Sequence, residues 1–300
     1  MAEIIVKNKV PAFETIKTLV GNENQVIREL GLPFTVRDNS TLNKILGIEP
    51  TTYPPTNQIP TIGYFCIGAG GAEFTNAGAN NQGFSPVPYL YQHEVVHTGL
   101  FKMIPFVMRE QSNDLTIAER AKYGLRTLVE TSNGTTYVAY YLKRLDLAQV
   151  RIESKVIRKT GENEFTESLL TDAMLNPAPT PRKLSVTEEN ILKATYVETF
   201  ANVKVSLNSD DLNELSNVLN ILTGSPFGAP ITEIGLVSGM DKIVSIATNS
   251  GNANFKEVIA AQLSHIMQCY YLLSTQSGVF EKEVQLGVSE PMAVFSEDKR

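Results

Sequence analysis

The sequence predicts an α+β fold made mainly of antiparallel β-structure, in hairpins or a sandwich-like arrangement, with one clear helix and a short helical N-terminal arm. Asn133-Gly134 lies between two runs of strand-forming residues, which is a strong short-range signal for a β-hairpin. Leucines recur at helical spacing over residues 209–223, which predicts an amphipathic helix. Proline-rich stretches at 49–60 and 176–183 hold few core-forming residues, so we expect them to separate three parts of the chain.

The predicted hairpin covers residues 119–147. If Asn133 and Gly134 form the two-residue loop of a type I′ turn, the two strands pair in one definite register. That register gathers mostly apolar side chains on one face, which must then be buried. The expected pairs are Val129 with Val138, Thr127 with Tyr140 and Leu125 with Leu142.

Residues 1–60 are predicted to form an N-terminal arm. Apolar residues at helical spacing between Phe13 and Val20 predict a short helix that ends at Gly21, and residues 26–30 predict a second helix. The segment 49–60 holds four prolines and predicts an extended connector. The apolar stripes of the two helices are too small to form a core by themselves, so we expect the arm to pack mainly on other subunits.

The body is predicted to consist of two β-rich units. The first unit, residues 61–175, begins with a buried strand at Thr61–Gly68 and continues as a loop rich in Gly, Ala and Asn to Gly83. Its later part contains a second predicted hairpin, with residues 149–159 and 165–170 as strands.

The second unit, residues 184–300, contains the helix 209–223. Asn208 or Ser209 caps this helix at its start, and Gly224 ends it. The other predicted elements are a strand at 191–207, two strands within 231–246 around a turn at 238–241, a polar loop at 249–254 and a strand at 255–273.

The composition excludes several classes of partner. The 26 basic residues are outnumbered by 32 acidic ones, so we expect no direct nucleic-acid partner. No apolar run reaches the roughly 18 residues that a membrane-spanning helix needs, and the N-terminus lacks a secretion signal, so we expect no membrane partner and synthesis in the cytoplasm. Cys66 and Cys269 lie among apolar neighbours, which favours buried thiols over a disulfide.

A glycine cluster at the end of the strand 61–68 raises the hypothesis of a dinucleotide-binding loop. Gly68, Gly70 and Gly71 would let backbone amides approach a phosphate. The third glycine of that fingerprint falls at Glu73, and no helical pattern follows it. We therefore expect no cofactor at this loop.

The segment His93–His97 (HEVVH) matches H-E-x-x-H, the signature of zinc proteases. On a helix, the two histidines lie one turn apart and can bind one zinc ion, with Glu94 as general base. Pro86, Pro88 and the two valines of the motif favour extended backbone instead. On a strand, the Cα atoms of His93 and His97 stand about 13 Å apart, which is too far for one shared metal.

A third zinc ligand would have to be Glu119, Glu130 or His265, and none of them belongs to a recognisable ligand motif. We therefore expect that the motif binds no zinc and that His93 and His97 are partly exposed residues of a strand or loop. A zinc metallohydrolase built on this motif remains the alternative.

The segment 231–236, ITEIGL, is followed by a short turn and a second apolar strand in the prediction. This pair resembles the E-I-G-L strand pair of tail, collar and fibre-attachment proteins of tailed bacteriophages. The hairpin sequence TTYVAYYLKRLD at 135–146 and the composition of residues 176–200 resemble the same proteins. The resemblance implies a virion structural subunit that assembles around the tail axis, in the baseplate, in the neck or collar, or as a fibre adaptor.

The expected function is therefore that of a structural protein without catalytic, cofactor-binding or metal-binding residues. Only 19% of the residues are charged and 42% are apolar, which suits a chain that hides much of its surface in contacts with copies of itself and other virion proteins. A cellular protein-binding module is a further alternative. A discrete ligand pocket on a monomer would distinguish such a module.

Overall fold

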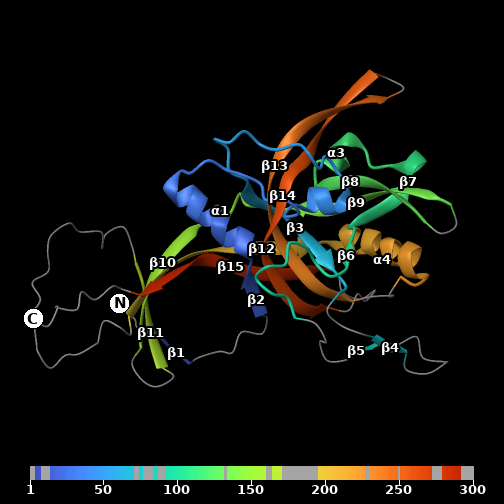
Figure 1. Cartoon of the computed structure of the whole chain (residues 1–300). Coiled ribbons are helices and arrows are strands. Elements are labelled where there is room, and N and C mark those ends of the chain that lie inside the picture. Colours follow the sequence, from blue (N-terminus) through green and yellow to red (C-terminus); the bar gives the residue numbers. More distant parts are fainter. Residues whose placement is uncertain are drawn as a thin grey trace, which may run out of the picture. The chain divides into compact units, whose positions relative to one another are not determined.

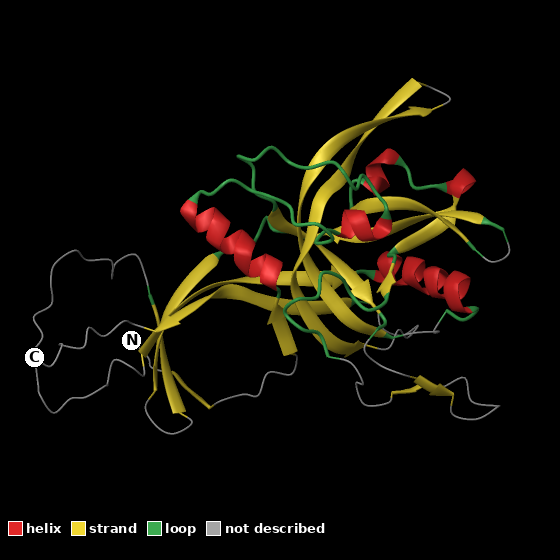
Figure 2. Cartoon of the chain, in the orientation of Figure 1, coloured by secondary structure: helices red, strands yellow, loops and turns green. Residues whose placement is uncertain are grey.

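Figures 1 and 2 show the computed structural model of the chain. The structure describes residues 4–7, 14–70, 74–76, 84–86, 92–131, 134–159, 164–170, 195–226, 230–248, 251–271 and 279–291. Antiparallel strands dominate these residues, and few helices accompany them (Figure 2). The predicted class, α+β and mainly antiparallel β, is confirmed.

The chain divides into two compact units, and each is assembled from segments that are far apart in the sequence. The smaller unit comprises residues 1–12, 147–204 and 282–300, and the larger unit comprises residues 13–146 and 205–281. These units differ from the predicted division into residues 1–60, 61–175 and 184–300. Proline content suggested those boundaries. Within each unit, however, strands from distant segments of the sequence pair with each other.

The smaller unit carries strands of a five-stranded sheet in the order β1-β11-β10-β12-β15. They are β1 (Ile4–Lys7), β10 (Ile152–Lys159), β11 (Glu164–Leu169), β12 (Thr195–Leu207) and β15 (Phe280–Pro291). β10 and β11 pair antiparallel, which confirms the second predicted hairpin. Its predicted turn at 161–163 lies outside the described residues.

The larger unit is built on an eight-stranded sheet with the main path β2-β14-β13-β3-β9-β7, where β6 also pairs with β3 and β8 with β9. The strands are β2 (Glu14–Lys17), β3 (Thr61–Gly68), β6 (Met103–Ile104), β7 (Val107–Glu110), β8 (Tyr123–Glu130), β9 (Thr136–Arg144), β13 (Ile231–Thr248) and β14 (Gly251–Tyr271). β3 confirms the predicted strand at 61–68. In a small pair, β4 (Phe74–Asn76) lies within the stretch predicted to be a loop to Gly83, and its partner β5 (Phe84–Pro86) follows that stretch.

The described helices all belong to the larger unit. They are α1 (Leu19–Leu30), α2 (Leu42–Leu46), the 3-10 helix η1 (Gln111–Asn113), α3 (Ile117–Arg120) and α4 (Ser209–Thr223). None of these described helices is long and apolar enough to cross a membrane.

α4 confirms the predicted helix with the same bounds. Asn208 caps its first turn, and Asp211 completes a capping box by accepting from the backbone N–H of Asn208. Gly224 ends the helix with a φ of 76°, a left-handed conformation that costs glycine little. The predicted leucine stripe packs inward at Leu212, Leu215 and Leu219, whereas Leu222 is exposed.

The core of the larger unit forms where α2, β3, β8, β9, β13 and β14 meet. Its buried side chains supply the hydrophobic stabilisation that holds segments from both halves of the chain together. They include Leu42, Tyr64, Cys66, Leu125, Leu142, Val237, Val258, Leu263 and Ile266.

β13 is one long strand, so the prediction of two strands around a turn at 238–241 is wrong. Its pairing with β14 continues through register shifts between Leu236 and Val237 and between Ser238 and Met240, where β14 carries the extra residue. Gly239 looked like a turn residue, but a side chain there would press against Val258 at 2.7 Å. The predicted loop at 249–254 is also too long, because β14 begins at Gly251. The predicted strand at 255–273 is confirmed through Tyr271, where the described part of β14 ends.

β8 and β9 form the predicted hairpin, but their register is shifted by one residue. Leu128 lies opposite Val138 and Arg126 opposite Tyr140, where Val129 and Thr127 were predicted. The N–H of Gly134 donates to the carbonyl of Thr131 at 2.9 Å, and Gly134 has a φ of 80°. The register therefore differs from that of the predicted two-residue type I′ loop, of which Asn133 lies outside the described residues. Val138, Tyr140 and Leu142 are nevertheless buried as expected.

The segment 14–60 packs on the sheet of its own chain, so the prediction of an arm that packs mainly on other subunits is wrong. β2 pairs with β14, and the hydroxyl of Thr18 donates to the carbonyl of Leu263 at 2.6 Å. Asn24 of α1 donates to Gln262 of β14 at 3.0 Å. Helix propensity alone gave no sign of this partner strand, which lies near the other end of the sequence.

Asn43 of α2 holds an irregular point of β14. Ala260 has a φ of 48°, an unusual left-handed value that interrupts the regular strand. The Asn43 side chain donates to the carbonyl of Val258 at 2.8 Å and accepts from the N–H of Ala261 at 2.8 Å. It thereby satisfies backbone groups on both sides of the irregular residue.

Glu257 plays the same part between β14 and β8. Leu125 has a φ of 53°, and its N–H donates to the Glu257 carboxylate at 2.7 Å, while Arg126 donates at 3.3 Å. The N–H of Val258 donates to the same carboxylate at 2.8 Å. Burial raises the pKa of Glu257, and these backbone donors partly oppose that rise.

Gly21 lies inside α1, so the prediction that a helix ends at this glycine is wrong. A single helix runs from Leu19 to Leu30 and ends at Gly31, which has a φ of 62°. A Cβ atom at Gly21 would overlap the backbone carbonyl oxygen of Ser264 in β14. The glycine therefore permits close packing of α1 on the sheet.

Replacing Gly21 with Ala should destabilise the protein by about 1–3 kcal/mol, because overpacking outweighs the gain of roughly 1 kcal/mol in helix propensity. Asn22 is exposed on the same helix, so Asn22→Ala is the matched control and should be neutral or slightly stabilising. Urea unfolding of the full chain measures both variants. A Gly21→Ala variant as stable as Asn22→Ala would contradict the close packing of α1 on β14.

Candidate functional site

His93 and the glycine loop singled out in the sequence meet at Glu233, a residue of β13 whose side chain is fully buried at 0% exposure. Its carboxylate accepts three backbone N–H groups, from Gly70 at 2.7 Å, Phe101 at 2.9 Å and Lys102 at 3.3 Å. The ring nitrogen Nε2 of His93 lies 2.5 Å from the oxygen Oε1 of the same carboxylate. Both oxygens are therefore engaged, and the group joins β13 to two loops.

His93 and His97 lie in a turn, which is neither the helix nor the strand considered for the motif. The N–H of His97 donates to the carbonyl of Glu94 at 3.1 Å, and the two ring nitrogens Nδ1 come within 3.2 Å of each other. His93 is only 3% exposed, so the expectation of a partly exposed residue is wrong for His93. It holds for His97, which is half-buried, while Glu94 is exposed.

The hydrogen bonds assign one proton in this cluster. The N–H of Glu94 donates to Nδ1 of His97 at 3.0 Å, so that nitrogen acts as an acceptor. A hydrogen bond between the two rings then requires the proton on Nδ1 of His93. Nε2 of His93 faces the carboxyl group of Glu233.

Phe101 packs the two histidine rings in place. Its ring stacks on His93, with centroids 4.0 Å apart and an angle of 12° between the planes. It meets His97 edge to face, with centroids 5.3 Å apart. The carbonyl of Val95 accepts from the N–H of Leu19 at 2.7 Å, so the same turn also contacts the start of α1.

The glycines proposed for a dinucleotide loop serve this carboxylate. A Cβ atom at Gly68 or Gly70 would overlap Glu233 or its neighbours. The N–H of Gly70 does bind an anion, but that anion is a side chain of the same protein. Gly71 and Glu73 lie outside the described residues.

The three residues considered as a third zinc ligand have other surroundings. Glu119 forms the capping box of α3 with Thr116, and Glu130 is the exposed last residue of β8. His265 lies on β14, opposite Leu236 of β13 and Lys17 of β2. The acidic partner of the histidines is instead Glu233, which the sequence analysis missed. Its signal in the sequence is a single acid inside an apolar strand.

The arrangement suits a structural role better than chemistry. The oxygens of Glu233 and the facing nitrogens of the two histidines are all used in hydrogen bonds. Among the described residues, no group of three His, Cys, Asp or Glu side chains is placed to share a metal ion. The absence of zinc binding stays a prediction. Cys66 and Cys269 are buried and form no disulfide, as expected, and burial raises the pKa of Cys66 well above its ordinary value.

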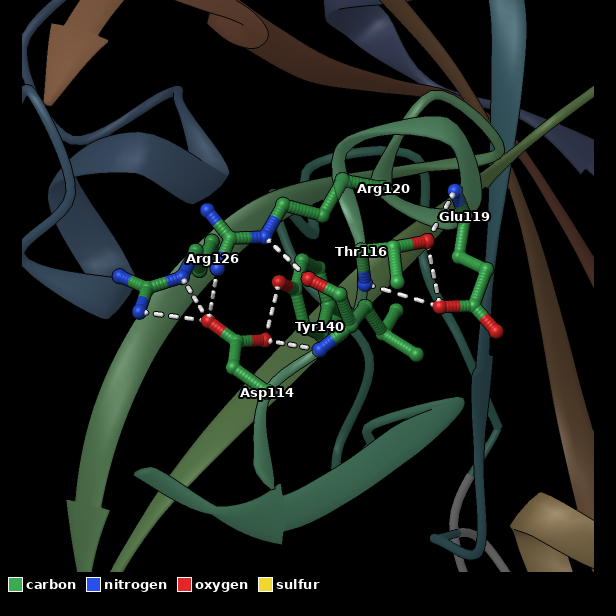
Figure 3. A network of polar contacts seen from close by, with 7 residues as sticks. Asp114, Thr116, Glu119, Arg120, Arg126 and Tyr140 are labelled. Atoms are coloured by element: carbon green, nitrogen blue, oxygen red, sulfur yellow. Dashed lines mark hydrogen bonds and ion pairs between the residues drawn. The ribbon is translucent and has the colours of Figure 1, made fainter. Parts of the chain in front are cut away.

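Asp114 forms a second polar network, shown in Figure 3. Oxygen Oδ1 accepts from the Tyr140 hydroxyl at 2.6 Å and from the N–H of Leu115 at 2.7 Å. Oxygen Oδ2 accepts from Arg120 at 2.5 Å and from Arg126 at 2.8 Å. Burial and the bond to Asp114 raise the pKa of Tyr140 above its ordinary value. Two guanidinium groups neutralise the carboxylate, so this network anchors α3 to β8 and β9.

Replacing Glu233 with Gln should destabilise the protein by about 2–5 kcal/mol, because the amide NH₂ would face backbone N–H donors and His93 would lose the carboxyl group that it bonds. Glu94→Gln makes the same chemical change at an exposed site of the HEVVH motif and should have little effect. Chemical unfolding of both full-length variants measures the difference. Equal stability of the two would show that Glu233 does not hold these loops.

His265 should make the stability of the protein depend on pH. Burial, with a smaller contribution from Lys17, lowers its pKa to about 4, and its buried Nδ1 has no hydrogen-bond partner among the described residues. Because the folded pKa lies below the unfolded value of about 6.5, this contribution is fully present above pH 6.5. It is lost as the pH falls towards 4, by at most about 3 kcal/mol.

A His265→Gln variant cannot titrate at this position and should lose less stability than the wild type when the pH falls from about 7.5 to about 4.5. Urea unfolding of both proteins at the two pH values measures the difference. Parallel losses in the two proteins would contradict the assignment of this pH dependence to His265.

Comparison with known proteins gives a family. No curated protein matches the chain, and no solved structure matches it. A family model described as a family of unknown function, DUF7208, matches residues 5–299. Since this match spans nearly the whole sequence, the chain belongs to the DUF7208 family.

Proposed function

We propose that this protein is a non-catalytic structural subunit of a tailed-phage virion, made in the host cytoplasm. In this proposal it assembles with copies of itself and with other tail, baseplate, neck or collar proteins, and it contacts neither nucleic acid nor membrane directly. The resemblance at ITEIGL suggests the class of protein, and a projecting ribbon of the larger unit supports assembly with neighbouring subunits.

The ribbon is the outer part of the β13–β14 hairpin (Figure 1). β3 pairs with β13 only over Glu233–Gly239, and β2 pairs with β14 only over His265–Gln268. Among the described residues, the segments 240–248 and 251–259 therefore pair only with each other. A two-stranded ribbon is marginally stable by itself in water, and its unpaired edges are templates for further strands.

Side chains anchor the base of the ribbon but leave its outer part uncovered. The Nζ atom of Lys242 lies 3.2 Å from Oε2 of Glu49, and the guanidinium of Arg120 lies 5.8 Å from the ring centroid of Phe255. Ile243 is 69% exposed. An exposed isoleucine on a projecting ribbon fits a surface that a neighbouring subunit covers.

The structure explains why the ITEIGL segment contains an acid and a glycine. Glu233 binds the backbone of two loops. Gly235 has no room for a side chain, because a Cβ atom there would overlap Leu263 and lie 2.7 Å from the sulfur of Cys66. A motif whose acid and glycine are both used in packing supports a scaffold rather than an enzyme. The zinc-hydrolase alternative is weakened, because the atoms it needs are already bonded within the chain.

The proposal is tested on virions of the phage that encodes the chain. Quantitative mass spectrometry of gradient-purified particles should find several copies in each virion, and antibodies against the chain should label one position along the tail axis. A chain that is abundant in the infected cell but missing from purified particles would overturn the proposal.

The role of the ribbon is tested by complementation with an Ile243→Asp variant. This substitution should reduce incorporation into particles at least about tenfold, because it places a charge in an apolar contact. Ile152 is an equally uncovered isoleucine on β10, so Ile152→Asp is the matched control and should be incorporated normally. Normal incorporation of Ile243→Asp would exclude the ribbon as the contact surface.

A further inference from the structure

A groove of about 430 Å³ lies between β7 and α4 in the larger unit. Its lining includes Met108, Arg109 and Glu110 of β7 and Asn213, Glu214 and Asn217 of α4. The groove is wide open and mostly polar, and none of its residues belongs to the cluster around Glu233.

The groove runs along the edge of a sheet. β7 is the last strand of the path β2-β14-β13-β3-β9-β7, so one of its sides has no neighbouring strand among the described residues. Successive side chains of a strand point to opposite faces. Residues 108–110 all line the groove, together with Tyr137 of β9, so the groove runs along this part of β7. The edge so lined is about 10 Å long.

Asn217 already makes the kind of bond that an added strand would make. Its side-chain amide donates to the carbonyl of Met108 at 3.2 Å. A carboxamide N–H is chemically equivalent to a main-chain N–H, so this contact shows that the backbone carbonyl of β7 can accept an amide from the groove side. Asn213 lies one turn before Asn217 on α4. Its side chain is exposed and makes no hydrogen bond within the described part of the chain.

The charges of the groove select among peptides. Arg109 is paired with Glu214, so this cation is already neutralised. Glu110 is exposed and forms no ion pair with the described residues. One uncompensated negative charge thus remains, which favours a ligand that carries Lys or Arg over one that carries Asp or Glu.

We infer that this groove binds an extended, basic polypeptide segment of a partner protein, which adds to β7 as a further strand. Main-chain hydrogen bonds to the edge of β7 hold the segment, and side chains of α4 cover its other side. An added strand takes over the Met108 carbonyl from Asn217, and a strand edge recognises a peptide backbone, whereas a sugar has no matching repeat of donors and acceptors. The inference does not depend on the proposed virion role, because the groove is formed by the chain alone.

The probe is a random library of 12-residue peptides displayed on yeast and selected against the full-length protein. Enriched peptides should contain more Lys and Arg than Asp and Glu, and they should bind with dissociation constants of roughly 1–100 μM. Addition of a synthetic selected peptide should slow hydrogen exchange of the backbone amides in residues 107–110.

Three exposed substitutions locate the binding site. Asn213→Trp fills the groove and should weaken binding at least about tenfold. Asn220 is exposed on α4 but does not line the groove, so Asn220→Trp is the matched control and should bind like the wild type. Glu110→Lys should weaken the binding of the same basic peptides and leave unfolding by urea unchanged.

Several results would overturn the inference. They are a selection that enriches no peptide, a selected peptide that protects another surface, and unchanged binding to Asn213→Trp. Binding of a soluble oligosaccharide such as maltotriose at this groove, without any peptide, would assign the groove to another class of ligand. Loss of peptide binding would leave the virion test untouched, because that test detects the chain in particles.

Discussion

Buried main-chain groups without a strand partner are the constraint on which the larger unit depends. Its two longest strands, β13 and β14, are irregular, and each buried N–H left unsatisfied would cost about 1–3 kcal/mol. Glu233, Glu257 and Asn43 meet this need, because each bonds to backbone groups of another segment. Polar side chains in this core therefore continue the sheet where regular pairing stops, and the loops and helices that they hold follow from that.

Local signals predicted the parts of the fold whose cause is local. Helix 209–223 was predicted with its bounds because its cap, its acidic first turn and its terminal glycine all lie within the segment. The hairpin at Asn133-Gly134 was predicted, but its register was not, because this dipeptide suits both two-residue and three-residue loops. Gly21 was misjudged because a glycine at a helix end and a glycine at a close contact look alike in sequence. Only β14 distinguishes the two cases.

The candidate site was visible in the sequence only as separate pieces. The HEVVH motif and the glycines at 68–71 suggested two unrelated chemistries, and the structure joins their described residues through one acid. Glu233 stood out only as a charge inside an apolar strand, and no spacing rule connects it to His93. Distances along the chain carry no information about which loop a buried carboxylate will bind. The site is thus predictable in composition and unpredictable in assembly.

The pairing of β3 with β13 sets the order of events during synthesis. The partner residues lie about 170 positions apart, so β3 leaves the ribosome roughly 10–30 s before its neighbour exists. During that interval the segment 61–68 can pair with β6 and β9 but lacks its β13 neighbour, and the edge left open is a template for pairing with other nascent chains. The larger unit therefore completes its sheet only near the end of translation. Slower initiation of translation or a lower growth temperature should then give a higher yield of folded protein than faster initiation or a higher temperature.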